Sequence, residues 1–302
     1  MTPITSSKDA LFAFGNELAM NSSGVVAFNA ITASNSHAIF KSDGTTKTLI
    51  ADSAANGLAG AFMGAPSINA AGTVAFFSLR AERGLPSSIF TGSGGPLTTL
   101  AMSTPTDFST FSNVAINDPG TIVFQGFRTD GSVGLFTLQG NQADIVDTNT
   151  HPEFFSFGDP VINNAGTIAD VAFLNAGPIE IISGNTRGIT LRTDPKAAPV
   201  LTNSEHPSIN NRGAVAFYAM PTNPGDGGVT GIFLEVSRGH SLIPVIKPGD
   251  NLFGSTVVGV DFGRFALNDQ FQMVFSYNLN DGRSGLAIAS FDGENEEDDR
   301  QN

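Results

Sequence analysis

The chain has 302 residues and a formal net charge of −13, and it contains no cysteine. Its 15 Lys and Arg residues are scattered, which excludes a basic surface for a nucleic-acid backbone. The lack of Cys excludes disulfides, thiolate catalysis and cysteine metal sites, and no apolar run approaches the roughly 18 residues of a membrane span.

The start of the chain, MTPITSSKD, lacks the basic and apolar regions of a secretory signal. The chain as given is therefore expected to be soluble and cytoplasmic, or secreted if an N-terminal signal has been removed. It is expected to act as a monomer, without membrane insertion.

Composition favours an all-β protein. The chain has 25 Phe and 34 Gly but no Trp, and no long stretch places apolar residues at helical spacing. Strand-forming and turn-forming residues are thus both abundant.

One motif occurs six times and reads PSINNRGAVAFY at Pro207 to Tyr218. Its turn asparagines are separated by 48, 48, 46, 47 and 58 residues, and they are Asn21, Asn69, Asn117, Asn163, Asn210 and Asn268. A period of this length indicates an array of supersecondary units.

Each unit opens with a short apolar strand, an Asn-x-x-Gly turn and a Val/Ile-x-Phe strand, which is hairpin chemistry. A third strand is expected in every unit, at Ala38 to Phe40, Ser88 to Phe90, Gly134 to Phe136, Pro178 to Ile181, Gly231 to Phe233 and Gly285 to Ile288. A fourth is expected in five units, at Thr46 to Ala51, Leu97 to Met102, Ala143 to Val146, Gly188 to Arg192 and Ser241 to Ile246.

Four antiparallel strands in each of six units predict a six-bladed β-propeller. The sixth unit has no fourth strand after its third, so we expect Met1 to Thr5 to pair with Gly285 to Phe291 and close the ring. One propeller domain is expected over 1–291. Residues 292–302 carry six carboxylates and are expected to form a disordered acidic tail.

The repeated P-S-I-N-x-x-G-x-V-A-F pattern, the G-I-F that follows about fifteen residues later, and the KPGDNLFGSTV stretch from Lys247 resemble a known repeat family. It is the uncharacterised β-propeller repeat family of many bacterial, often secreted or surface, proteins. The resemblance runs from Phe12 to Phe291. It implies the propeller fold and no agreed activity.

Two units depart from the repeat. Asp170 stands where other units have the Phe of V-A-F, and Phe271 replaces the turn glycine of the sixth unit. A bulge in the fourth blade and a remodelled turn in the sixth are expected.

The position four residues before the turn Asn is the least repeated in the motif, and alternation directs it toward the axis. We call the set the ring residues; they are Glu17, Ala65, Asn113, Asp159, His206 and Arg264. His206 could act as a general base, Asp159 or Glu17 could orient it, and Arg264 could hold negative charge. Alternatively, these groups solvate a wet channel mouth and pair with one another.

Loops on the same face offer further ligand-binding candidates. They are Arg80 and Arg128, together with the only two tyrosines, Tyr218 and Tyr277, which suit either ligand stacking or packing at the rim. No short catalytic motif is present. No metal ligand set is expected, although the Asp130-Gly131 and Asp281-Gly282 pairs leave Ca²⁺ open beside their ordinary reading as turns.

Three functions remain open at this point. The leading hypothesis is a recognition propeller that holds a small molecule or glycan at the channel mouth. The rival is a hydrolase or lyase that uses the ring residues there. The third is a structural or surface-display module.

Overall fold

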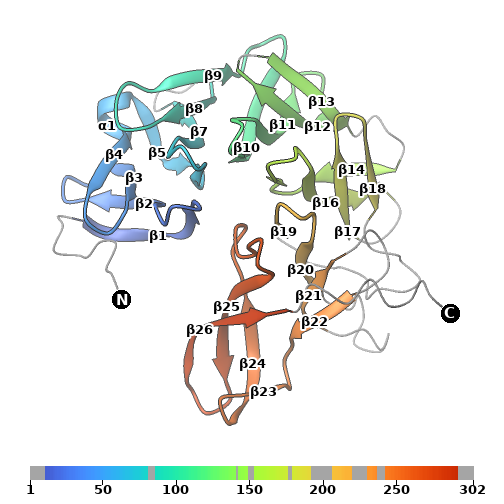
Figure 1. Cartoon of the computed structure of the whole chain (residues 1–302). Coiled ribbons are helices and arrows are strands. Elements are labelled where there is room, and N and C mark those ends of the chain that lie inside the picture. Colours follow the sequence, from blue (N-terminus) through green and yellow to red (C-terminus); the bar gives the residue numbers. More distant parts are fainter. Residues whose placement is uncertain are drawn as a thin grey trace.

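The computed structural model describes residues 11–80, 86–140, 142–148, 153–175, 179–191, 206–219, 230–236 and 242–291. Six antiparallel sheets are arranged around a common centre (Figure 1), which confirms the predicted six-bladed β-propeller. One four-residue helix, α1 (Ser53–Asn56), follows the first blade, and the side chain of Asp52 caps its N-terminus.

The first three blades follow one another along the chain. Blade 1 holds β1 (Leu11–Met20), β2 (Val26–Thr32), β3 (His37–Ser42) and β4 (Lys47–Asp52). Blade 2 holds β5 (Leu58–Met63), β6 (Ser67–Ile68), β7 (Val74–Arg80), β8 (Ser88–Gly92) and β9 (Thr98–Met102). Blade 3 holds β10 (Phe108–Ile116), β11 (Ile122–Arg128), β12 (Val133–Gln139) and β13 (Gln142–Thr148).

The last three blades complete the ring. Blade 4 holds β14 (Phe154–Phe157), β15 (Val161–Ile162), β16 (Ile168–Leu174), β17 (Ile179–Asn185) and β18 (Gly188–Leu191). Blade 5 holds β19 (Ser208–Ile209), β20 (Val215–Ala219), β21 (Gly231–Glu235) and β22 (Leu242–Ile246). Blade 6 holds β23 (Asn251–Leu252), β24 (Ser255–Asp261), β25 (Gln272–Leu279) and β26 (Ser284–Ser290). The third strands expected in all six units and the fourth strands expected in five are found, whereas the strand expected before Asn268 is a single bridge between Leu267 and Met273.

The Asn-x-x-Gly turns join neighbouring blades as well as neighbouring strands. In blade 5 the Gly213 N–H donates to the Asn210 carbonyl at 3.0 Å, with φ of 83° at the glycine. The Asn210 side chain accepts from the backbone of its own turn, and its Nδ2 donates 3.1 Å to the Asn268 carbonyl of blade 6. The same bond to the next blade is made by Asn21, Asn117 and Asn163.

The expected remodelling of the sixth turn is wrong. Phe271 adopts the glycine-like conformation with φ of 54°, and its N–H donates to the Asn268 carbonyl at 3.2 Å. The side chain is buried, and the guanidinium of Arg212 lies 5.3 Å from the ring centroid. Burial and this cation–π contact offset the strain of a left-handed phenylalanine.

The bulge expected at Asp170 is also not found there. β16 pairs with β17 in continuous register, with Asp170 opposite Ile182. The register shift of this blade lies between Phe154 and Ser156 in the first strand, where blades 1, 2 and 3 are irregular too. The carboxyl of Asp170 thus occupies the buried slot that a phenylalanine fills in the other blades.

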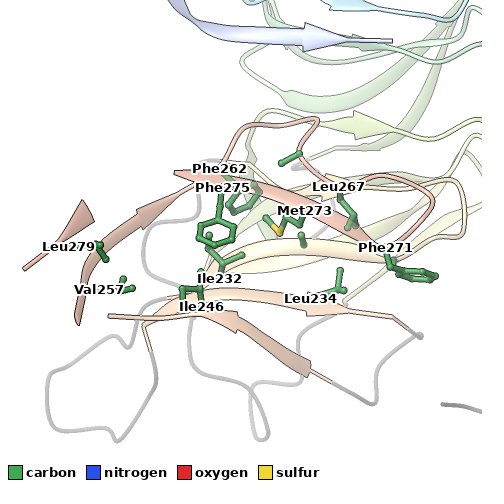
Figure 2. Close-up of a cluster of buried hydrophobic side chains, with 13 residues drawn as sticks. Ile232, Leu234, Ile246, Val257, Phe262, Leu267, Phe271, Met273, Phe275 and Leu279 are labelled. Atoms are coloured by element: carbon green, nitrogen blue, oxygen red, sulfur yellow. The ribbon is translucent and has the colours of Figure 1, made fainter. Parts of the chain in front are cut away.

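The hydrophobic core is divided into layers between consecutive blades. Five clusters of buried side chains each join two neighbouring blades. In the last of them, Ile232 and Leu234 of blade 5 pack against Met273 and Phe275 of blade 6 (Figure 2). Face-to-face packing of blades therefore supplies the apolar burial that stabilises the ring.

Blades 6 and 1 are not joined by such a cluster in the described part of the chain. The blade 1 face on this side holds only its own cluster around Phe28 and Phe40. On blade 6, Leu286 and Ile288 of β26 are 74% and 68% exposed. β26 has no strand beyond it among the described residues, and residues 1–5, expected to supply that strand, lie outside them, as does the acidic tail.

Within the described residues no helix is long and apolar enough to cross a membrane.

Candidate functional site

In blades 2, 3 and 4 the ring residue lies where the innermost strand is interrupted. Ala65 falls between β5 and β6, and Asp159 falls between β14 and β15. Asn113 lies at the register shift of β10, between Phe111 and Val114. Such irregularities re-aim a side chain and release backbone groups from the ladder. The least repeated position of the motif is therefore also the point where the inner strands of these three blades bend.

Asn113 connects three consecutive blades at this level. Its Oδ1 accepts a hydrogen bond of 3.0 Å from the Ala65 N–H of blade 2. Its Nδ2 donates 2.9 Å to Oδ2 of Asp159 in blade 4. Both side chains are half-buried. Two sequence-predicted site residues, Asn113 and Asp159, are thus in direct contact.

Asp159 and Asn113 retain hydrogen-bonding capacity. Oδ1 of Asp159 makes no hydrogen bond within the described residues, and neither does the second amide proton of Asn113. A carboxylate acceptor and an amide donor therefore stand side by side at the axis.

His206 belongs to the boundary between blades 5 and 6. Its Nε2 lies 3.0 Å from the Phe262 carbonyl oxygen, and its ring packs edge-on against the Phe262 ring at 5.8 Å. Because a carbonyl oxygen can only accept, Nε2 carries a proton in this contact. In the described part of the chain its partner is this carbonyl and not a carboxylate.

Arg264 crosses the axis. Its Nη2 donates 2.8 Å to the Pro160 carbonyl of blade 4 and 3.0 Å to the Val114 carbonyl of blade 3. These carbonyls hold the same place in their repeats, one residue after the ring position. Only 5% of Arg264 is exposed. The guanidinium therefore binds backbone carbonyls at the bends of blades 3 and 4. The sequence had predicted instead that Arg264 binds an anion.

Asp170 is the charged group that sequence reasoning treated only as a departure from the repeat. It is fully buried, its Oδ1 accepts 2.7 Å from the Val171 N–H, and its Oδ2 has no hydrogen-bond partner in the described part of the chain. Burial raises the pKa of this carboxyl well above its ordinary value, and nearby Asp159 adds to the rise while Arg264 opposes it. Asp170 is therefore a buried acid behind the ring.

The two tyrosines come from neighbouring blades, Tyr218 from blade 5 and Tyr277 from blade 6. Tyr218 is partly buried beside blade 6, where burial first and the charge of Asp261 second raise the pKa of its hydroxyl. Tyr277 of β25 packs against the same cluster, and the centre of its ring lies 5.5 Å from that of Phe253 in a tilted arrangement. Both tyrosines therefore pack against the cluster between blades 5 and 6.

The remaining candidates are outer residues or lie outside the description. Arg128 forms a 3.1 Å ion pair with Asp107 and lies 5.1 Å from the rings of Phe108 and Phe136. The side chains of Glu17 in β1 and Arg80 in β7 are outside the described residues.

The Asp-Gly turns direct their carboxylates into their own loops. Asp130 accepts from the backbone and hydroxyl of Ser132, and Asp281 accepts from the backbone and guanidinium of Arg283. In the part of the chain that the structure describes, no three His, Cys, Asp or Glu side chains come together as a metal site. The Ca²⁺ reading of these turns stays a prediction.

Comparison with known proteins extends the fold result. Prolyl oligopeptidase B from Galerina marginata matches with a TM-score of 0.58 and 11% identity, over 95% of this chain and 41% of that one. The β-propeller domain of the Trilobed protease from Pyrococcus furiosus gives 0.57 and 11%, over 93% and 84%. TolB from Acinetobacter baumannii gives 0.52 and 12%, over 89% and 64%.

The chain spans less than two thirds of TolB and of the oligopeptidase. At these identities the likeness concerns the fold alone. Comparison with curated proteins gave no match. A model of a family of unknown function (DUF7453) matches residues 3–180.

Proposed function

The chain belongs to this family of unknown function. We propose that it is a binding propeller for a small, uncharged, hydroxyl-rich ligand. The site is the inner bend of blades 3, 4 and 5, formed by Asn113, Asp159 and His206. We call it the ring site.

One observation carries the proposal: the ring site keeps polar atoms that neighbouring residues do not use. Oδ1 of Asp159, an amide proton of Asn113 and Nδ1 of His206 are without hydrogen bonds among the described residues, and all three side chains are half-buried. Convergent polar groups at a concave site are a general mark of ligand binding. Buried or half-buried polar atoms gain most when a ligand supplies their missing partner.

The donors and acceptors suit hydroxyl groups. A hydroxyl can donate to the Asp159 carboxylate and accept from the Asn113 amide. An anion is disfavoured because Arg264, the cation of the ring, is buried and bound to backbone carbonyls. Saccharides and polyols are therefore the ligand class that fits this set of groups.

The acid/base alternative has weaker support. A general base in a hydrolase or lyase is normally oriented by a carboxylate, whereas the contact of His206 is with the Phe262 carbonyl. Asp170 has the raised pKa of an acid, but it is fully buried and out of a substrate's reach.

A thermal-shift panel of neutral saccharides, polyols, sugar acids and amino sugars tests the proposal. The matched variant is Asp159→Asn, because the asparagine carbonyl can still accept from Asn113 while the free carboxylate oxygen is lost. We expect stabilisation by a neutral saccharide or polyol that disappears in Asp159→Asn. If no member of that class stabilises the wild type, or if the variant responds equally, the proposal is wrong.

A further inference from the structure

A polar cavity lies between blades 1 and 2, on the side of the Asn-x-x-Gly turns. It has a volume of about 390 Å³ and is lined by the turns of both blades and by the turn between β3 and β4. Among its side chains are Ser23, Lys41, Asp43, Thr46 and Thr48. We call it the blade 1/2 groove.

Lys41 breaks the repeat inside this groove. It pairs with Ala27 in the sheet, and the residues at the same register position in the other blades are Thr91, Thr137, Ser183, Leu234 and Ile288. All five carry hydroxyl or aliphatic side chains, and none is charged. A cation at this position is therefore a property of blade 1 and not of the fold.

The ammonium of Lys41 is held by one hydrogen bond and can donate two more. Nζ donates 2.7 Å to the Gly72 carbonyl in the turn of blade 2, and the side chain is half-buried. An ammonium carries three protons. Within the described residues the other two have no partner.

The rest of the groove is preorganised by its turns. Oδ1 of Asp43 accepts from the N–H groups of Thr45 and Thr46 at 2.8 and 2.7 Å. These bonds hold the pKa of Asp43 down to about 2 and fix the carboxylate as a charged group, while Oδ2 makes no hydrogen bond in the described part of the chain. Ser23, Thr46 and Thr48 add hydroxyls on the same lining.

We propose that the blade 1/2 groove binds a small carboxylate that carries hydroxyl groups. The ligand carboxylate takes the two remaining protons of Lys41 in a charge-assisted contact. Ligand hydroxyls donate to Oδ2 of Asp43 and exchange hydrogen bonds with the Ser and Thr hydroxyls. A simple anion leaves Asp43 unmatched and a neutral polyol leaves Lys41 unmatched, so both features are needed in one molecule.

This site is independent of the ring site, and the experiment separates the two. D-glucuronate is the probe, with D-glucose and acetate as the ligands that lack one feature each. Binding is followed by calorimetry and by the backbone amide shifts of Lys41 and Gly72. The variants are Lys41→Met, Asp43→Asn and, as the matched control, Lys47→Met, which removes a lysine outside the groove lining.

We expect glucuronate to bind the wild type and Lys47→Met saturably, with glucose and acetate weaker by about tenfold or more. Lys41→Met should lose about tenfold or more in glucuronate affinity, the scale of one lost charged contact. Asp43→Asn should weaken glucuronate and leave acetate unchanged; this variant keeps the tie between Lys41 and Gly72, so it tests the groove even if Lys41→Met is unstable. Asp159→Asn, in the ring site, should bind glucuronate as the wild type does.

Absence of saturable glucuronate binding would overturn the proposal. So would equal affinities for glucuronate, glucose and acetate, or wild-type glucuronate binding in both groove variants, because Lys41 would then serve only to tie blade 1 to blade 2.

Discussion

The side chain of Arg264 in blade 6 donates a hydrogen bond of 2.8 Å to the carbonyl oxygen of Pro160 in blade 4. These residues are 104 positions apart in the sequence. One guanidinium therefore fastens the last blade to the opposite side of the ring, at the level where the inner strands bend.

We expect Arg264→Met to lower the free energy of unfolding by about 3–5 kcal/mol, the scale for removing one member of a buried charged network. The carbonyls of Val114 and Pro160 lose their donor, and Asp170 loses the nearby positive charge. Urea denaturation measures the change. Arg212→Met is the control, because Arg212 is exposed; an equal effect in the two variants would argue against a special role for Arg264.

The pH dependence of the free energy of unfolding should reveal the raised pKa of Asp170. Burial raises its folded-state pKa above the ordinary value of 3.8, so its contribution to stability is full below that value and is lost as pH rises through the folded pKa. Asp170→Asn removes this dependence. The stability of the wild type relative to Asp170→Asn should therefore fall as pH rises above about 4.

The pKa of Asp43 is lowered, so its effect on stability changes with pH in the opposite direction to that of Asp170. Its pKa is lowered to about 2 by hydrogen bonds from Thr46 first and Thr45 next, so its contribution is present above 3.8 and is lost as pH falls toward 2. Unfolding curves collected at several pH values compare the two Asn variants with the wild type. A difference for Asp170→Asn that does not vary with pH would contradict a buried, protonated acid.

Phe271→Gly should cost less stability than an ordinary buried phenylalanine. Truncating a core phenylalanine typically costs about 3–5 kcal/mol, but the left-handed backbone at Phe271 stores about 1–2 kcal/mol that glycine releases. We expect a net loss of about 1–4 kcal/mol in the free energy of unfolding. Phe275→Ala is the control with no positive φ, and an equal or larger loss for Phe271→Gly would show that the turn is not strained.

In blade 6 the described residues hold no strand beyond β26, and the spacing of strands in the other blades predicts where that strand lies in the sequence. Five residues separate the fourth strand from the next first strand at Asp52 to Leu58, Met102 to Phe108 and Thr148 to Phe154. Five residues before Leu11, the first residue of β1, place the end of the expected strand at Thr5. Deleting residues 1–5 should therefore lower the melting temperature, whereas deleting 292–302 should leave it unchanged; equal effects would remove the N-terminus as the partner of β26.

The fold could be predicted from the sequence because the same turn and strand residues recur in each unit of the repeat. Asn210 and its counterparts were recognised as turn residues, but their bonds to the next blade depend on how blades stack, which a local pattern does not encode. The strand at Asp170 looked like a bulge because a carboxyl is costly in a phenylalanine slot. Its compensation includes Arg264, which comes from a distant repeat.

The ring position was identified as the least repeated one, and Asn113 and Asp159 do meet there. Arg264 was expected to bind an anion, but its guanidinium binds backbone carbonyls of blades 3 and 4. The sequence does not show which blades its side chain reaches across the axis. Lys41 was overlooked among strand residues, although aligning the third strands would have shown it as the one charge at its position.

The most direct test of the ring site is the side-chain amide signal of Asn113, observed by nitrogen-edited NMR while a neutral saccharide or polyol from the thermal-shift panel is added. The account predicts a saturable shift whose midpoint equals the calorimetric Kd, and loss of that shift in Asp159→Asn. Saturable binding of the ligand with the Asn113 amide signal unmoved would contradict it.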